Sequence, residues 1–321
     1  MIEKNNSKTL EQLYYYMALT RAFDQKAINL QRTGRLGTFP SSYGQEGLFV
    51  SAGLAIEKED SYCPYYRDQG ALIARNANIT RLLCYWGGFE IGNDLLSDRF
   101  DLPINVPIAS QTTHATGIAY AIKYRNEQRI ALCSIGDGGT SKGEFYESLN
   151  MSAVHKLPVL FVINNNCYAI STPISQQSAT LDLSKKGLAF DIPSINVDGQ
   201  NAIEVYNKIQ EMREHCLKRG PAIIVAKTYR LHDHTTADDA KRYLSENYIS
   251  DGENNDPIAR IQALISEDYI TKADKKIKDV INYSVDQYLA MTDTSSPFEY
   301  TFQKMPACLK HQKTICEAYN D

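Results

Sequence analysis

Two stretches of the chain, 129–135 and 158–163, are apolar at nearly every position. A strand with one face in water alternates apolar and polar residues, whereas a strand that is covered on both faces is apolar throughout. Strands of the second kind are typical of parallel sheets that carry helices on both faces. The chain therefore predicts an α/β fold with a mostly parallel sheet and helices on both faces.

Segments with helical and strand-like patterns alternate along most of the chain. The expected helices are 8–32, 44–56, 116–125, 143–155 and 201–218, with a further helix beginning over 69–74, and the expected strands are 129–135, 158–163, 194–197 and 222–227. In the helix after Gly143, Phe145, Leu149 and Ala153 are spaced four residues apart and form one apolar face. Residues 86–105 predict a loop, and charged helical segments follow residue 256 up to about residue 289.

Composition limits the partners and the location of the chain. Its 321 residues are 43% hydrophobic and 22% charged, and the formal charge is −4 with no dense Lys/Arg patch. This balance indicates a globular protein that acts on small molecules, and it argues against nucleic acid as a partner. No apolar run approaches the roughly 20 residues that cross a bilayer, and the N-terminus lacks a signal-peptide core. Because the seven cysteines are also scattered, we expect a cytoplasmic protein without a membrane partner.

The chain is expected to form one large domain over residues 1–290 and a C-terminal tail over 291–321. The tail contains Pro297, Pro306 and the aromatic residues Phe298, Tyr300 and Phe302. We expect these aromatic side chains to pack on this chain or on a partner subunit rather than to bind a ligand.

Polar residues stand where each of the two central strands ends. Gly136-Asp137-Gly138-Gly139 follows the first strand, and Asn164-Asn165-Asn166 follows the second. Glycines at the start of a helix bring backbone N–H groups close to an anionic group. The carboxylate of Asp137 and the amide oxygen of Asn166 are ligands that suit Mg²⁺, and ligands bind parallel sheets at this edge. The pattern predicts a site for magnesium and a diphosphate group.

Other phosphate-binding loops fit this segment less well. A dinucleotide-binding fingerprint requires glycine at position 141 and an acidic residue after the next strand, but the chain has Ser141 and the asparagine triplet. A Walker loop ends in Gly-Lys-Ser/Thr, whereas Gly143 is followed by Glu144. An Asp-Gly pair standing alone would indicate only a turn.

The combination of Gly136-Asp137-Gly138 with Asn165-Asn166 resembles the thiamine diphosphate motif of transketolase-like enzymes. From about Tyr14 to about Arg260, the chain is similar to the alpha subunits of the 2-oxo acid dehydrogenase first component. The supporting segments are Gly34-Arg-Leu-Gly, Tyr43-Gly-Gln-Glu, Tyr66-Arg67-Asp68, Pro107 to Gln111, and Tyr229-Arg230 through Asp239. The resemblance implies a transketolase-like fold in which residues 1–290 bind thiamine diphosphate and Mg²⁺.

The resemblance also implies which residues hold the diphosphate end of the cofactor. Mg²⁺ would be bound by Asp137, by the Asn166 side chain and by the main-chain carbonyl of Tyr168. The loop residues Gly136, Gly138 and Gly139 would bind the cofactor, the last two through N–H groups that contact phosphate.

A Tyr-Arg pair is the next implied contact. Arg67 would reach phosphate as a fork, and Tyr66 would lie near the pyrimidine. Without the family match, such a pair would be interpreted as a surface or interface segment.

Val106-Pro107-Ile108 resembles the loop that binds the aminopyrimidine through its backbone, with Ile108 as the wedge that bends the cofactor. From local sequence alone, Ile108 is equally well an ordinary buried isoleucine.

Two histidines are predicted to be catalytic. His234 matches the histidine of the family's Tyr-Arg-x-x-x-His loop and is also expected to contact the cofactor, and His232 lies two residues earlier. Histidine titrates near neutrality and can both donate and accept a proton. A metal cluster of these histidines with Asp238 and Asp239 is the alternative, whereas we expect the acids to order the loop through hydrogen bonds.

Thiamine enzymes need a glutamate beside the pyrimidine ring, and this family places it on a beta subunit. The resemblance therefore implies an alpha2-beta2 heterotetramer with the site at the alpha–beta interface and no activity of this chain alone. The expected reaction is oxidative decarboxylation of pyruvate, with acyl transfer to the lipoyl domain of an acyltransferase. Branched-chain 2-oxo acids and acetoin are alternative substrates, and a scaffold without cofactor is disfavoured by the presence of Asp137, Asn166 and Arg67. Thr235 stands where some relatives carry a phosphorylated serine.

Overall fold

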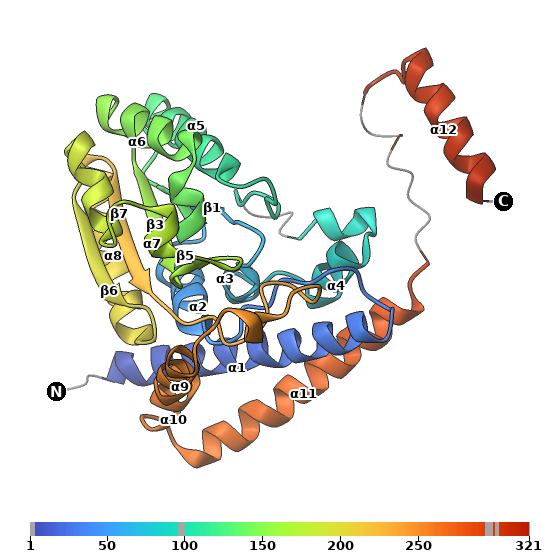
Figure 1. Cartoon of the computed structure of the whole chain (residues 1–321), viewed down its shortest axis with the longest axis horizontal. Helices are drawn as coiled ribbons and strands as arrows, with labels where there is room; N and C mark the ends of the chain where they lie inside the picture. The colour runs from blue at the N-terminus through green and yellow to red at the C-terminus, as the bar shows by residue number, and fades with distance from the viewer. Residues whose placement is uncertain (1–3, 96–99, 293–297, 299–301, 321) are drawn as a thin grey trace.

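A parallel five-stranded sheet forms the centre of the computed structural model, which describes residues 4–95, 100–292, 298 and 302–320 (Figure 1). In spatial order its strands are β1 (Ser61–Cys63), β2 (Ala131–Gly136), β3 (Val159–Asn165), β7 (Ala222–Lys227) and β6 (Ser194–Asp198). Every neighbouring pair is parallel. A small antiparallel hairpin is formed by β4 (Tyr168–Ala169) and β5 (Thr172–Pro173). The predicted α/β fold with a mostly parallel sheet is confirmed.

Helices precede, connect and follow these strands. The α-helices are α1 (Lys4–Arg32), α2 (Glu46–Ala55), α3 (Gln69–Ala74), α4 (Ile79–Gly87), α5 (Ser110–Tyr124), α6 (Gly143–Val154), α7 (Ile174–Gln177), α8 (Ala202–Arg219), α9 (Glu246–Asn254), α10 (Pro257–Gln262), α11 (Glu267–Ala290) and α12 (Ala307–Asn320). Short 3₁₀ helices are η1 (Glu90–Asn93), η2 (Asp137–Ser141), η3 (Leu183–Phe190) and η4 (Ala240–Arg242). The long helices α1 and α11 lie side by side in the lower part of Figure 1.

Alternate residues of the central strands enter two different hydrophobic clusters. Leu132 of β2 and Leu160 of β3 pack in the cluster that includes residues of α1, α2 and α8. Their neighbours Cys133 and Phe161 pack in a second cluster with Phe145 and other residues of α5 and α6. The sheet is therefore covered on both faces, which explains why these strands are apolar at nearly every position before their polar ends.

The register of the sheet places three connecting segments at one edge. Gly136 of β2 pairs with Asn164 of β3, so Asp137 and Asn166 follow neighbouring strands directly. Asn165 of β3 pairs with the last residue of β7, and the chain after β7 therefore leaves from the same edge. Neighbouring strands are about 4.8 Å apart, which brings these segments within reach of one another.

Several elements differ from the prediction. Helix α5 begins at Ser110 rather than at residue 116. The prediction missed this start because the first turn is polar and shows no apolar spacing. The helices α4, α9 and α12 and the three-residue strand β1 were not predicted. Residues 86–105 contain the short helix η1 in addition to the predicted loop, and 96–99 lie outside the described residues.

The C-terminal segment contains helix α12, which stands apart from the sheet in Figure 1 and whose described side chains are mostly exposed. Of the three aromatic residues noted in the tail, Tyr300 lies outside the described residues. The division at residue 290 and the packing of the tail on a partner stay predictions. Among the helices in the described segments, none combines the length and apolar character of a membrane span.

Candidate cofactor site

A cavity of about 480 Å³ lies at the edge of the sheet where β2 and β3 end. Small-molecule sites typically measure about 300–1,000 Å³. All predicted site residues except His232 line this cavity: Tyr66, Arg67, Val106, Ile108, Gly136, Asp137, Gly138, Gly139, Asn166, Tyr168 and His234. The fold thus brings together side chains from segments that are far apart in the sequence, and their roles toward a ligand stay predictions.

Asn166 is held in one orientation at the end of β3. Its side chain is buried, and its amide oxygen accepts a hydrogen bond from the backbone N–H of Tyr168 at 3.1 Å. Its backbone carbonyl accepts a hydrogen bond from the Tyr248 hydroxyl at 2.8 Å. An amide oxygen carries two lone pairs, so one remains available to a cation.

Asp137 is a buried carboxyl group at the end of β2, with 3% of its surface exposed. Burial raises the pKa of Asp137 to about 6, and hydrogen bonds from Gln177 and from the backbone oppose this shift. The Gln177 amide donates to Asp137 Oδ2 at 2.9 Å. A carboxylate and an amide oxygen at neighbouring strand ends form a donor set that suits Mg²⁺. The described segments contain no cluster of three or more His, Cys, Asp or Glu side chains placed to hold a metal ion.

Two glycines of this loop are required by close packing. A Cβ on Gly138 would lie 2.6 Å from the Cβ of Ala169, and a Cβ on Gly139 would lie 2.6 Å from Cγ1 of Ile135. Any larger residue would push these segments apart. The loop itself forms the short 3₁₀ helix η2, and α6 begins at Gly143, as predicted.

A second group of residues is basic: Arg67 lines the cavity, and Arg230, which does not line it, contacts the lining residue His234. Arg67 is 2% exposed and Arg230 is 0% exposed. Arg67 Nη2 and Arg230 Nη1 both donate to His234 Nδ1, at 3.0 and 2.8 Å. Their other hydrogen bonds go to neutral oxygens, namely the carbonyls of Ser41 and Ile170 and the Tyr243 hydroxyl, and the two guanidinium groups lie over the rings of Tyr66 and Tyr243. Within the described part of the chain, neither guanidinium forms an ion pair, and two such buried cations are typical of an anion site.

The two arginines fix the protonation state of His234. Burial, Arg67 and Arg230 together lower the pKa of His234 to about 3, and Asp238 opposes them only weakly. Since both arginines donate to Nδ1, the single proton of the neutral ring lies on Nε2. The Tyr66 hydroxyl is 3.5 Å from Nε2, at the limit of a hydrogen bond. The ring can therefore donate a hydrogen bond from Nε2, but it is not a cationic acid at neutral pH.

Residues 39–44 form a platform beneath this basic group, called the 39–44 platform below. The carbonyl of Ser41 accepts a hydrogen bond from Arg67 Nη1 at 2.5 Å. The backbone N–H of Thr236, in the loop that carries His234, donates to the carbonyl of Phe39 at 3.0 Å. The platform thus holds Arg67 and the His234 loop together.

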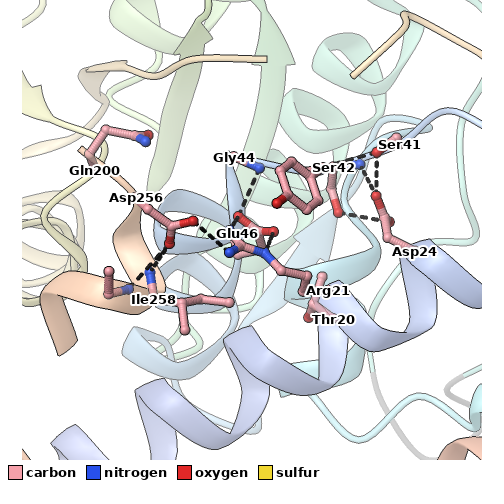
Figure 2. Close-up of polar contacts among 12 residues, drawn as sticks. Thr20, Arg21, Asp24, Ser41, Ser42, Gly44, Glu46, Gln200, Asp256 and Ile258 are labelled. Carbon is pink, nitrogen blue, oxygen red and sulfur yellow. Dashed lines mark hydrogen bonds and ion pairs between the residues drawn. The ribbon is translucent and has the colours of Figure 1, made fainter. Parts of the chain in front are cut away.

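The 39–44 platform is anchored to α1 by a buried carboxyl group, as Figure 2 shows. Asp24 accepts hydrogen bonds from the Ser41 hydroxyl at 2.5 Å, from the Ser42 backbone at 2.7 Å and from the Ser42 hydroxyl at 3.0 Å. Burial raises the pKa of Asp24 to about 7, although these hydrogen bonds oppose the shift.

An ion-pair network ties the same platform to α2 and α10 (Figure 2). Arg21 of α1 contacts Glu46 at 2.7 Å and Asp256 at 2.6 Å. Glu46 also accepts a hydrogen bond from the Gly44 backbone at 2.9 Å. Gly44 has a φ of +86°, and a Cβ there would lie 2.5 Å from the Tyr229 carbonyl, so only glycine fits.

The rim of the cavity is apolar and exposed. Val106 is 51% exposed and Ile108 is 46% exposed, so the interpretation of Ile108 as an ordinary buried isoleucine is wrong. Ala109, which directly precedes α5, has a φ of +70°, and Ile170 has a φ of +55°. Left-handed backbone is costly for a β-branched residue and is often found at functional sites. Both strained residues line the cavity.

His232 lies outside this cavity. Its ring stacks on Tyr43 with a centroid distance of 4.2 Å, and burial lowers its pKa. The neighbouring acids order the loop, as expected, because Asp238 accepts from the His234 backbone at 2.8 Å and Asp233 accepts from the Ala240 backbone at 2.8 Å. The position of His232 gives no support to a catalytic role, and the acids are engaged in hydrogen bonds rather than in a metal cluster.

Sequence reasoning gave no role to three residues that the structure places at the site. Arg230 belongs to the motif that runs from Tyr229-Arg230 through Asp239, but its burial beside His234 could not be predicted from the sequence. Gln45 contacts Asn166, and Gln177 contacts Asp137. The Tyr43-Gly-Gln-Glu motif was a signal for Gln45, whereas nothing in the local sequence singles out Gln177.

Comparison with known proteins agrees with this architecture. The family model described as Dehydrogenase E1 component matches residues 14–296. A Mycoplasma genitalium protein named pyruvate dehydrogenase E1 component subunit alpha is 35% identical, over 99% of this chain and 93% of the relative. Proteins of the same name from Mycoplasma pneumoniae (32% identity; 98% and 90% covered) and Staphylococcus aureus strain Mu50 (35%; 95% and 85%) are also similar.

These matches confirm the predicted resemblance to alpha subunits of 2-oxo acid dehydrogenases. They span nearly the whole chain, and the matched region contains every residue that lines the cavity. The chain belongs to the dehydrogenase E1 component family.

Proposed function

We propose that this chain is the alpha subunit of a pyruvate dehydrogenase and binds thiamine diphosphate through Mg²⁺. The observation that carries the proposal is the pair of unmatched charges at one cavity. A buried carboxyl group, Asp137, and two buried guanidinium groups, Arg67 and Arg230, have no ion-pair partner among the described residues. A magnesium diphosphate group carries both complementary charges, since its cation suits the carboxylate and its phosphate oxygens suit the arginine forks.

The residues fit distinct tasks toward this group. Asp137, the Asn166 amide oxygen and the Tyr168 carbonyl would hold the metal, and Arg67 with the N–H of His234 Nε2 would contact phosphate. When bound, thiamine diphosphate supplies a carbon nucleophile that adds to the keto carbon of a 2-oxo acid and takes up the electrons released with CO₂. The chain's own contribution is to position the cofactor and to exclude water.

His234 would act here as a neutral hydrogen-bond donor. The two arginines keep its proton on Nε2, and burial together with the arginines holds its pKa far below neutrality in the free chain. An anion placed between the arginines would reduce their effect on the ring and so raise its pKa again. The predicted part of His234 in proton transfer therefore depends on a bound anion.

The apolar rim supports the proposal of a beta subunit. Val106 and Ile108 line the cavity and are about half exposed in the chain alone. If Ile108 is the wedge under the cofactor, another polypeptide would be needed to bury these side chains. A beta subunit that covers the rim would also bring the glutamate that thiamine chemistry needs. We include in the proposal an alpha2-beta2 assembly, acyl transfer to a lipoyl acyltransferase, and a cytoplasmic location, because seven cysteines scattered along the chain suit a reducing compartment.

The test is coexpression of this chain with its beta subunit, followed by rates with pyruvate, 2-oxoisovalerate and acetoin. We expect decarboxylation of pyruvate to be fastest, to require added thiamine diphosphate and Mg²⁺, and to be absent from the chain alone. One methylene in a pocket changes specificity by only about 1–3 kcal/mol, so the substrate must be measured. Full turnover by the chain alone would contradict the shared site, and a faster rate with 2-oxoisovalerate or acetoin would replace pyruvate as substrate.

A further inference from the structure

Two glutamines contact the proposed metal ligands from different parts of the chain. Gln45 stands directly before α2, and its side chain is 0% exposed. Gln177 is the last residue of α7, after the β4–β5 hairpin. Gln45 bonds the amide of Asn166, and Gln177 bonds the carboxylate of Asp137.

The orientation of the Asn166 amide follows from its neighbours. The backbone N–H of Tyr168 can only donate, so the atom it contacts at 3.1 Å must be the Asn166 oxygen. The Asn166 nitrogen therefore points the other way, and it donates to Gln45 Oε1 at 3.1 Å. Without this acceptor, the Asn166 nitrogen would be a buried donor without a partner, and the amide would gain by rotating.

Gln45 is itself fixed by a second amide. Asn164 Nδ2 donates to the same Gln45 Oε1 at 2.7 Å and also contacts the Tyr65 hydroxyl at 2.9 Å. The Thr228 hydroxyl donates to Asn164 Oδ1 at 2.5 Å. Gln45 thus serves as an acceptor for two buried amides, and an acceptor is what the position requires.

Gln177 serves the opposite purpose, as a donor. Its Nε2 lies 2.9 Å from Asp137 Oδ2 and 3.3 Å from the carbonyl of Thr172, and both of these oxygens can only accept. Asp137 Oδ2 is thereby engaged within the chain, which restrains the orientation of the carboxylate. Gln177 Oε1 lies 3.3 Å from the position of a Cβ on Gly138, at the glycine loop.

The second polar atom of each glutamine is unused. Gln45 Nε2 and Gln177 Oε1 are buried and have no hydrogen-bond partner in the described part of the chain. Buried polar atoms without partners are uncommon and are often completed by a ligand or by ordered water. At Gln45 and Gln177 this unpartnered atom occurs in a side chain that contacts a proposed metal ligand.

We propose that Gln45 and Gln177 are positioning residues that aim one oxygen of Asn166 and one oxygen of Asp137 at the magnesium ion. This inference rests on the proposed function, because it assumes that these two residues are the metal ligands. Gln45 acts by accepting from the Asn166 nitrogen, and Gln177 acts by donating to the second carboxylate oxygen of Asp137. Partners that orient metal ligands in this way commonly change metal affinity by about 10- to 100-fold when they are removed.

The test exchanges the hydrogen-bonding character of each glutamine. Calorimetry measures the binding of Mg²⁺ to the assembled alpha–beta protein in the presence of saturating thiamine diphosphate. Gln45→Met and Gln177→Met should each weaken Mg²⁺ binding by about 10- to 100-fold. Gln45→Glu should bind within about threefold of the native protein because it keeps an acceptor, whereas Gln177→Glu should be weaker than Gln177→Met because it sets two carboxylates against each other.

Two glutamines elsewhere in the chain provide matched controls. Gln200 is 1% exposed, donates one side-chain hydrogen bond to the Asn255 carbonyl, and likewise has an unpartnered Oε1 (Figure 2 shows its place). Gln176 is the exposed neighbour of Gln177 on α7. Gln200→Met and Gln176→Met should leave Mg²⁺ binding unchanged.

A second readout separates positioning from a general loss of stability. Mg²⁺ requires near-octahedral ligand geometry, whereas Ca²⁺ accepts irregular sets of oxygens. The methionine variants should therefore lose more affinity for Mg²⁺ than for Ca²⁺, while a variant that is only less stable should lose both equally.

The outcomes distinguish this inference from the proposed function. If the native assembly shows no Mg²⁺-dependent binding of thiamine diphosphate, the proposed function fails and this inference fails with it. If the native assembly binds and both methionine variants bind equally well, only the positioning inference is overturned. Equal effects of glutamate at 45 and at 177 would also overturn it, and this comparison decides the matter if the methionine variants do not assemble.

Discussion

The acidic and basic residues of the cavity form two groups that differ in sign but share one property. Asp137 is a buried acid whose pKa is raised to about 6, and His234 is a buried base whose pKa is lowered to about 3. Each group is therefore displaced toward its neutral state, chiefly because burial disfavours its charged form and the opposite charges nearby, Arg230 for Asp137 and Asp238 for His234, do not offset that cost. The comparison teaches that both halves lack a bound counter-charge in the chain alone, and the proposed magnesium diphosphate would supply a cation to one half and an anion to the other.

The largest expected effect comes from removing the acidic half. Asp137→Ala takes away the only carboxylate in the proposed metal site and should weaken Mg²⁺-dependent binding of thiamine diphosphate by more than about 100-fold, as loss of a direct ligand exceeds loss of its supporting partner. Calorimetric titration of the assembled alpha–beta protein measures this. Asp251→Ala, at an exposed position on α9, is the control. An unchanged titration of Asp137→Ala would remove the metal assignment and break the comparison.

Removing one arginine from the basic half should have the next largest effect. Arg67→Met keeps most of the buried volume but removes a charge-assisted hydrogen bond to phosphate, worth about 1.5–3 kcal/mol. The affinity for thiamine diphosphate should fall about 10- to 100-fold, with the Mg²⁺ dependence retained. Arg242→Met, an exposed arginine of η4, should bind normally. If Arg67→Met abolished only the Mg²⁺ dependence, the two halves would not be separate sites for cation and anion.

Lowering the pH should change the stability of the cofactor-free chain in opposite directions through His234 and through Asp137. The pKa of His234 is lowered from 6.5 to about 3 on folding, so the unfolded chain binds a proton that the folded chain refuses, and stability is lost as the pH falls from about 6.5 toward 3. The pKa of Asp137 is raised from 3.8 to about 6, so its contribution to stability grows as the pH falls from about 6 toward 4.

Urea unfolding at pH 7.5 and pH 5 separates these contributions. His234→Gln should reduce the loss of unfolding free energy between the two pH values by on the order of 1–2 kcal/mol, and Asp137→Asn should make that loss larger. His311→Gln, on the exposed helix α12, should leave it unchanged. Shifts of the same sign in both site variants would contradict the opposite displacement of the two groups.

The smallest effect is expected at the tyrosine between the two halves. The hydroxyl of Tyr66 is 3.5 Å from His234 Nε2, too long for a strong hydrogen bond. Tyr66→Phe should therefore change the affinity for thiamine diphosphate by no more than about threefold in the same titration. A loss of tenfold or more would show that the hydroxyl belongs to the basic half.

The strands and the acidic loop could be predicted because their signals are local. Leu132 and Cys133 enter different clusters on opposite faces of the sheet, and this double burial makes β2 apolar at nearly every position. The position of Asp137 then follows from where the strand ends. By contrast, α5 begins in a polar turn at Ser110, where no apolar spacing marks it.

The contacts that complete the site could not be predicted, because they join segments that are distant in the sequence. Gln177 reaches Asp137 across 40 positions, and Gln45 reaches Asn166 across 121 positions. The state of His234 depends on two arginines, of which Arg67 is 167 positions away. A single histidine in a motif suggests a titrating group, and only the burial of both arginines beside it reverses that expectation.

Half-exposed Val106 and Ile108 at the mouth of the cavity carry a consequence for the cell that makes this chain. Exposed apolar side chains at such an opening favour association with other proteins or with further copies of the chain. Copies made in excess of the polypeptide that covers this opening would accordingly tend to aggregate. The two polypeptides would therefore have to be made in matched amounts.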